Sequence, residues 1–231
     1  MRKGEERKQC ILKTAQQLFC ENGYASTSID EIISILSLSK GGFYHYFSSK
    51  ESLLLEICKN KAEDTVKKAK SACESIDGTW ADKFNALFDS YGLWGASDAD
   101  FMTLLMTIPD IKVRETLKSE LTQKMLPLLR EIVIGGVNSG EFTTPYPEGT
   151  ADLILQLGTS FSDVIARALS DLNGLNTVQI LSDLELYRYA IEKVLGAPYG
   201  SIVHYEMRPM TENLQMLYER RQNTLNGGNS K

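Results

Sequence analysis

Hydrophobic and polar residues alternate along this chain with the period of an α-helix. Apolar side chains recur every three or four residues, a spacing that gathers them on one helix face. Such segments begin near Ile11 and Leu53, and longer ones cover residues 111–138, 148–172 and 178–195. The pattern predicts an all-α protein in which a small N-terminal helical domain is joined by a linking helix to a larger helical domain.

Residues 26–53 read as two short helices with a tight polar turn between them. Ser28 stands three residues before Glu31, so the two side chains can satisfy the free amides of a helix start as a capping box. The polar stretch 37–39 competes for backbone hydrogen bonds and ends this helix, and Ser39 is placed to cap the next one. This layout is typical of a helix-turn-helix.

The second short helix, at about residues 40–47, contains two adjacent glycines. Gly41 and Gly42 each cost about 1 kcal/mol relative to alanine in a helix interior, so close approach to another backbone is a reason to keep them. Phe43 and Phe47 can anchor the helix and turn polar donors outward. Those outward side chains are Lys40, Tyr44, His45 and Tyr46. They suit phosphates and base edges in a major groove, whereas the plainer interpretation is a hairpin with a solvated face.

A third helix start follows immediately. Ser48 and Glu51 are spaced as a second capping box, and Lys50 lies beside the free amides that this helix would present. A phosphate could be held there by the helix dipole and the ammonium together. The charge distribution agrees with a phosphate-bearing partner. Residues 1–50 hold seven Lys or Arg against five acids, whereas the rest of the chain holds 18 against 25, for a net charge of −5 over the whole chain.

Residues 7–57 resemble the DNA-binding domain of the TetR family of bacterial transcriptional regulators. The motifs that carry the resemblance are Glu21-Asn22-Gly23-Tyr24, Thr27-Ser28-Ile29 and Gly42-Phe43-Tyr44-His45-Tyr46-Phe47-Ser48-Ser49-Lys50-Glu51-Ser52-Leu53. The resemblance implies that Thr27 or Ser28 touches phosphate, that Lys40, Gly41 and Tyr44 face bases or sugar edges, and that Tyr46 and Lys50 contact phosphates. The expected DNA-binding residues are Thr27, Ser28, Ser39, Lys40, Gly41, Tyr44, His45, Tyr46 and Lys50.

An aromatic stripe follows the linking helix and could line a cavity for an apolar or aromatic effector. Pro127 and the glycines at 92–95 and 135–136 favour a cavity, as does the family resemblance. Solid core is an equally good interpretation for any single residue of the stripe. The candidate pocket residues are Trp80, Phe88, Tyr91, Trp94, Phe101, Met102 and Met106.

The last two long helices carry more apolar surface than one partner helix would use. In the TetR family these helices form a four-helix bundle with a second subunit, so the resemblance implies a symmetric homodimer. The alternative is that they pack only within one subunit. The candidate interface residues are Leu157, Phe161, Ile165, Tyr187 and Ile191. The expected domains are 1–50 for DNA binding, 51–197 for effector binding and dimerisation, and 198–231 as an extension with a disordered end.

The sequence gives little support for a metal site or a catalytic site. Four cysteines include no C-x-x-C pair and the chain has two histidines, so we expect neither a metal site nor a cofactor. No glycine-rich phosphate loop accompanies them, which argues against an enzyme. The chain has no signal peptide and no run of eighteen apolar residues, which predicts a cytoplasmic protein without a membrane partner.

We therefore expect a ligand-responsive transcriptional regulator, with a repressor as the preferred form. It would bind a palindromic double-stranded DNA operator as a homodimer and leave it when a small-molecule effector binds the larger domain. One alternative is a helical small-molecule-binding or interaction protein that lacks DNA binding. An enzyme is the second, and less favoured, alternative.

Overall fold

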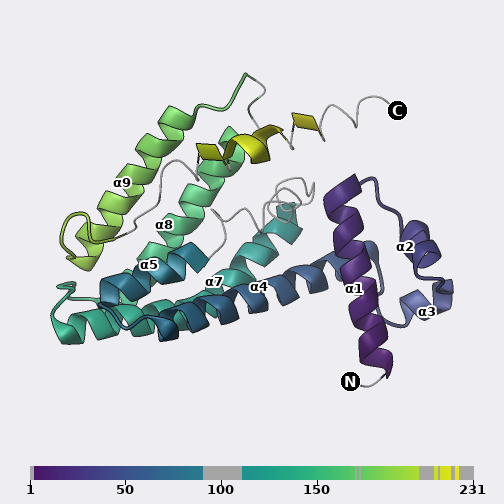
Figure 1. Cartoon of the computed structure of the whole chain (residues 1–231), viewed down its shortest axis with the longest axis horizontal. Coiled ribbons are helices and arrows are strands. Elements are labelled where there is room, and N and C mark those ends of the chain that lie inside the picture. The colour runs from purple at the N-terminus through teal and green to yellow at the C-terminus, as the bar shows by residue number, and fades with distance from the viewer. Residues whose placement is uncertain are drawn as a thin grey trace. The chain divides into compact units, whose positions relative to one another are not determined.

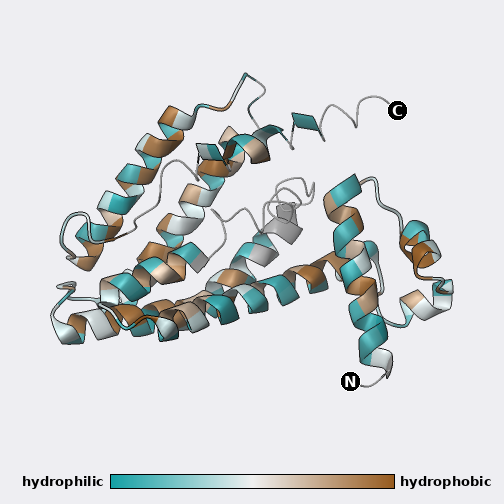
Figure 2. Cartoon of the chain, viewed as in Figure 1, coloured by the Kyte–Doolittle hydropathy of each residue, from teal (hydrophilic) through white to brown (hydrophobic). Residues whose placement is uncertain are grey.

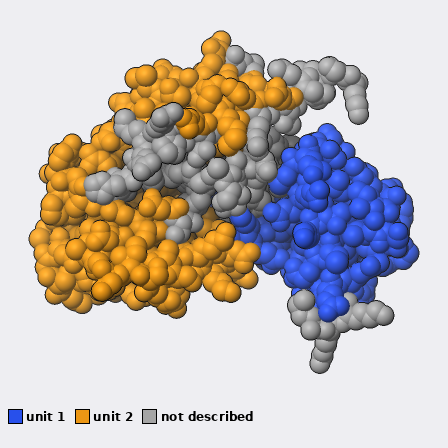
Figure 3. Space-filling model, viewed as in Figure 1, with its two compact units in different colours: residues 1–62, 100–120 blue, residues 63–99, 121–231 orange. Residues whose placement is uncertain are grey.

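The structure, a computed structural model, describes residues 3–90, 111–169, 171, 173–202, 211–212, 214–219 and 222–223. Over these ranges the regular elements are helices, as predicted (Figure 1), and hydrophobic residues recur along them (Figure 2). The chain forms two compact units, residues 1–62 with 100–120 and residues 63–99 with 121–231 (Figure 3).

The first unit contains α1 (Lys3–Asn22), α2 (Ile29–Ile35), α3 (Lys40–Tyr44) and the beginning of α4 (Lys50–Ser75). Apolar residues from all four helices meet in one core, which orients the short α3 against the longer elements. The most deeply buried members are Ile11, Ala15, Phe19, Ile32, Phe43, Leu53 and Leu54. Since a five-residue helix is unstable alone, this packing is what holds α3 in place.

Serine caps set the helix starts of the first unit. The box at Ser28 is confirmed, because its Oγ accepts from the Glu31 amide at 3.1 Å and the Glu31 carboxylate accepts from the Ser28 amide at 3.5 Å. The second box is shifted by one residue from the prediction: Ser49 and Ser52 exchange amide-to-hydroxyl bonds, both of 3.0 Å. The prediction at Ser48 was wrong because α4 begins at Lys50, which makes Ser49 the residue before its first turn.

The second unit contains α5 (Trp80–Ser90), most of α7 (Ile111–Ser139), α8 (Pro147–Ala168) and α9 (Thr177–Leu195). The last three match the long segments that the apolar spacing predicts. Figure 1 shows α8 and α9 side by side, and Ser160 of α8 shares a 3.0 Å hydrogen bond with Tyr187 of α9. Pro127 lies inside α7 and does not end it.

Two glycines of α7 pack against aromatic rings and do not line an open cavity. A Cβ built on Gly135 would overlap the Trp80 indole, and one on Gly136 would overlap the Phe142 ring. The glycine pair therefore gives α7 a flat surface on which both rings pack closely. This corrects the expectation that residues 135–136 favour a cavity. Glu141 fixes the same corner, since its carboxylate accepts from the Trp80 amide at 2.8 Å.

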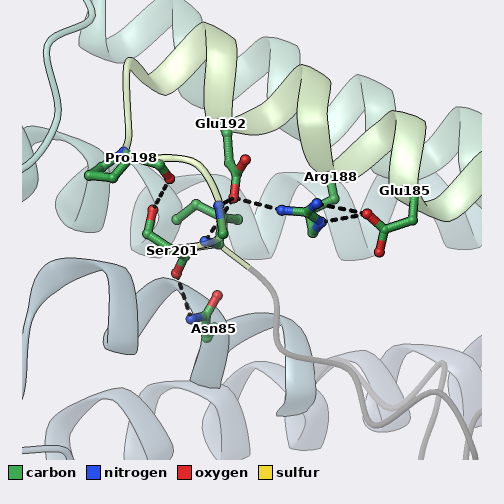
Figure 4. Close-up of polar contacts among 8 residues, drawn as sticks. Asn85, Glu185, Arg188, Glu192, Pro198 and Ser201 are labelled. Atoms are coloured by element: carbon green, nitrogen blue, oxygen red, sulfur yellow. Dashed lines mark hydrogen bonds and ion pairs between the residues drawn. The ribbon is translucent and has the colours of Figure 1, made fainter.

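A turn after α9 is held by a buried carboxylate (Figure 4). Glu192 is 2 % exposed, and its Oε1 accepts from the amides of Gly200 at 2.7 Å and Ile202 at 3.2 Å. Arg188 donates to the same oxygen at 2.9 Å. The turn also contacts α5, because Asn85 donates to the Ser201 carbonyl at 3.1 Å. Residues 198–202 are thus part of the folded second unit.

Candidate nucleic-acid interface

The outward face of α3 is open and polar. Phe43 anchors the helix with no exposed surface, while Tyr44 is 52 % exposed and Lys40 and His45 are also exposed. A Cβ built on Gly41 would meet no atom of the protein within 4 Å. The space above Gly41 is therefore free for another molecule, as the sequence predicts.

The exposed Lys40 forms an ion pair with Asp30 of α2. Its ammonium lies 3.0 Å from the Asp30 carboxylate, and this hydrogen-bonded partner raises the pKa of Lys40. Both side chains are about 70 % exposed, at 71 % and 69 %, so solvent screens the pair. Asp30 was not among the predicted site residues, although its place in the first turn of α2 is a common one for an acid. A phosphate that approaches Lys40 therefore meets the negative charge of this carboxylate beside it.

Thr27 and Ser28 differ in their exposure. Thr27 is 1 % exposed, and its hydroxyl donates to the carbonyls of Gly23 at 3.0 Å and Leu18 at 3.2 Å. Its side chain braces the loop and is not available to a phosphate in this structure. Ser28 is exposed at the start of α2, so of the two it is the better candidate for a phosphate contact.

Lys50 also points into the protein. Its Nζ donates to three main-chain carbonyls, those of Tyr24 at 2.8 Å, Thr27 at 2.9 Å and Ala25 at 3.4 Å. It lies 4.5 Å from the centre of the Tyr24 ring, and burial lowers the pKa of the ammonium. An ammonium has three N–H donors, so all of them have acceptors within the chain. This placement differs from the expected phosphate contact.

The remaining DNA-facing candidates are Ser39 and Tyr46. Ser39 caps α3, where its Oγ accepts from the Gly42 amide at 3.0 Å. Tyr46 is half-buried against the core of the first unit, and its ring meets the His45 ring edge-on with centres 5.1 Å apart. Tyr46 can therefore offer DNA little beyond its hydroxyl.

Two of the expected pocket residues lie in the described part of the second unit, and both pack against its core. Trp80 covers Gly135, and Phe88 stacks on Phe84 with ring centres 4.7 Å apart. The other five lie outside the described residues. They are Tyr91, Trp94, Phe101, Met102 and Met106.

The expected dimer residues are largely used within the single chain. Phe161, Ile165 and Ile191 are 2 to 7 % exposed, and the Phe161 ring contacts that of Tyr187 at 5.0 Å. Leu157 is partly buried. Buried side chains offer a partner little surface in the single chain, and a dimer interface at these residues stays a prediction.

The opposite face of α9 carries apolar residues that the sequence interpretation missed. Val178, Leu186 and Tyr189 are 76 %, 64 % and 47 % exposed. Positions 178, 186 and 189 fall within one sector of a helical wheel, opposite the buried Ile180 and Leu195. The signal for this surface was available in the sequence but was outweighed by the stronger buried stripe.

Metal-binding clusters and membrane-spanning helices are absent from the described residues. No group of three or more His, Cys, Asp or Glu side chains is placed to hold a metal ion there. Across the same ranges, no helix is long and apolar enough to cross a membrane.

Comparisons with known proteins agree with this geometry. Residues 11–57 match the family model described as bacterial regulatory proteins, tetR family. The HTH-type transcriptional regulator YerO of Bacillus subtilis is 36 % identical over 107 residues, which span 44 % of this chain and 36 % of that protein. YuxN of the same organism, also an HTH-type transcriptional regulator, is 23 % identical over 98 % of this chain and 81 % of its own length.

Structural similarity extends over both units. A TetR-family transcriptional regulator from Pectobacterium atrosepticum shares the fold with a TM-score of 0.66 at 18 % identity, over 86 % of this chain and 99 % of that one. Over the described residues the chain is all-helical with an N-terminal helix-turn-helix, the fold of these TetR-family regulators. Residues 11–57 of this chain are thus similar to the DNA-binding domain of the TetR family of bacterial regulatory proteins, and the fold of the chain is similar to that of TetR-family regulators.

Proposed function

We propose that this chain is a ligand-responsive repressor that binds double-stranded DNA through the outward face of α3. The observation that carries the proposal is the open surface at Gly41, flanked by the exposed donors of Lys40 and Tyr44. A helix without side chains at this point can approach the floor of a major groove, where such donors meet base edges and phosphates. Ser28 and His45 complete the proposed contacts.

The proposed assembly is a symmetric homodimer. A pair of recognition helices about 34 to 36 Å apart reads two half-sites of a palindrome, which a single short α3 cannot do. We place the contact on the exposed apolar residues of α9, Val178, Leu186 and Tyr189, in place of the buried Phe161 and Ile191. Similarity to the TetR family supports a dimer.

The proposed control is release by a small apolar or aromatic effector bound in the second unit. Effector control is typical of TetR-family regulators, and α4 runs without interruption from Lys50 to Ser75, which suits it to transmit a change. The ligand needs only a higher affinity for the conformation that fits the operator poorly. Similarity to the same family supports a cytoplasmic location.

Selection of DNA from a random duplex library by the full-length chain tests the proposal. We expect enrichment of a palindrome whose half-sites are about 10 bp apart, and a linear fall of log affinity with log salt concentration. A chain that enriches no sequence and binds duplex without salt dependence would be a helical binding protein outside this function.

A further inference from the structure

Lys50 occupies a position that needs an explanation. It is the first residue of α4, and the N-terminus of a helix carries a partial positive charge that disfavours a cation. Acceptors outside α4 stabilise the ammonium in this position. The loop between α1 and α2 supplies them, although it lies more than twenty residues earlier in the chain.

The loop carbonyls converge on one nitrogen. The oxygens of Tyr24 and Thr27 lie 2.8 and 2.9 Å from Nζ, and that of Ala25 lies 3.4 Å away. The Tyr24 ring approaches the same ammonium at 4.5 Å, and Tyr24 itself packs edge-on against Phe19 of the core at 5.1 Å. Charge-assisted bonds and a ring face together offset the desolvation of the ammonium.

The same loop fixes the start of α2. The amide and the hydroxyl of Thr27 both donate to the Gly23 carbonyl, the amide at 3.2 Å. The Thr27 carbonyl that Lys50 binds therefore belongs to a residue that is already fixed in place. The next residue, Ser28, is the cap of α2. Any displacement of the Lys50 ammonium therefore acts on the residue before this cap.

We infer that Lys50 is a positioning residue that ties the first turn of α4 to the N-terminus of α2 and so fixes the orientation of the helix-turn-helix. This role rests on the proposed DNA-binding function and deepens it. It identifies three hydrogen bonds through which a shift at the start of α4 reaches the DNA-reading helices. Lys50 then contributes no phosphate contact of its own.

Amide hydrogen exchange on the full-length chain without DNA provides the first test. Lys50→Met keeps the apolar stem and removes the three donors. We expect the amides of Thr27 and Glu31 to exchange about ten- to a hundredfold faster, the factor that corresponds to lost charge-assisted hydrogen bonds. Lys40→Met removes an exposed lysine of the same domain and should leave both exchange rates unchanged. Because no operator is needed, this arm decides the inference even if the proposed function fails.

DNA binding of the same variants provides the second test, under conditions in which both are fully folded. Lys50→Met should lower the ratio of specific to nonspecific affinity and leave the salt slope unchanged. Lys40→Met should reduce the slope by about one ion. Unchanged exchange rates for Lys50→Met together with a reduced salt slope would show that Lys50 is a phosphate ligand, and would overturn the inference.

Lys50→Arg separates geometry from charge. A planar guanidinium directs its donors in one plane and is a poor match for three carbonyls that converge on one nitrogen. We expect an unchanged salt slope with fast exchange at Thr27 and altered amide chemical shifts at Ser28 and Glu31. Wild-type exchange, shifts and specificity in Lys50→Arg would show that a positive charge alone is sufficient, which contradicts the positioning role.

Discussion

Each unit contains a charged side chain that holds a loop by its main-chain groups. In the first unit, the Lys50 ammonium gathers three carbonyls and remains partly exposed. In the second unit, the Glu192 carboxylate accepts from two amides and Arg188 and is 2 % exposed, and its Oε2 has no hydrogen-bond partner among the described residues. The loop bound by Lys50 is remote in sequence and the turn bound by Glu192 is near, yet both are fixed by a single charge, of opposite sign and at different cost in desolvation.

The exposed faces of the two units differ as well. The outer face of α3 is polar and has an open glycine, whereas the outer face of α9 presents Val178, Leu186 and Tyr189. Polar donors around an open backbone suit a polyanion, and an apolar stripe suits a protein partner. The difference separates the proposed DNA surface from the proposed assembly surface.

The largest expected effect is the loss of Glu192. Glu192→Ala leaves the Gly200 and Ile202 amides and part of the Arg188 guanidinium without an acceptor, so we expect the free energy of unfolding to fall by about 3–5 kcal/mol. Urea denaturation measures it. Glu185 also binds Arg188, at 2.7 Å, but is 56 % exposed, so Glu185→Ala should cost no more than about 1 kcal/mol. Equal losses for the two variants would remove the distinction drawn from burial.

The next effect concerns assembly and compares two faces of the same helix pair. Leu186→Glu places a charge on the exposed face of α9 and should give folded monomers in sedimentation. The melting temperature of these monomers should be close to that of the wild-type chain in its monomeric form. Phe161→Glu buries the charge within the chain and should destabilise it by several kcal/mol. A Leu186→Glu variant that remains dimeric would exclude this surface.

The smallest effect is expected at the exposed ion pair. Asp30→Asn releases Lys40, so affinity for nonspecific duplex at low salt should rise by about two- to fivefold, the range of an exposed pair. Stability should change by less than about 0.5 kcal/mol. Fluorescence anisotropy with a labelled duplex measures the first and thermal unfolding the second. Weaker binding by Asp30→Asn would mean that Asp30 orients Lys40 usefully.

The sequence predicted those parts of the fold that depend on local spacing. The helices at 111–139 and 177–195 and the cap at Ser28 require only neighbours three or four residues away. The second cap lies at Ser49 and not at Ser48, because either of two consecutive serines can cap a helix. The tertiary contacts of Lys50 then select the residue at which α4 starts.

Distant partners account for what the sequence did not predict. Lys50 finds its carbonyls in a loop 23 to 26 residues earlier, and no side-chain pattern marks a main-chain acceptor. An apolar stripe also cannot tell a core within one subunit from an interface between two. For that reason Phe161, Ile165 and Ile191 were predicted at a dimer interface although they are buried within the single chain, while Gly41 and Tyr44 of the family motif lie on an exposed face.

Operator binding by Gly41→Leu tests the central claim most directly, which is that the open face of α3 approaches DNA closely. Because a Cβ at Gly41 meets no protein atom within 4 Å, the variant should fold with an unchanged or higher melting temperature. Its specific binding to the selected palindrome should be lost, since the leucine occupies the space that belongs to the groove. A stable Gly41→Leu variant that binds the palindrome with wild-type affinity would contradict the account.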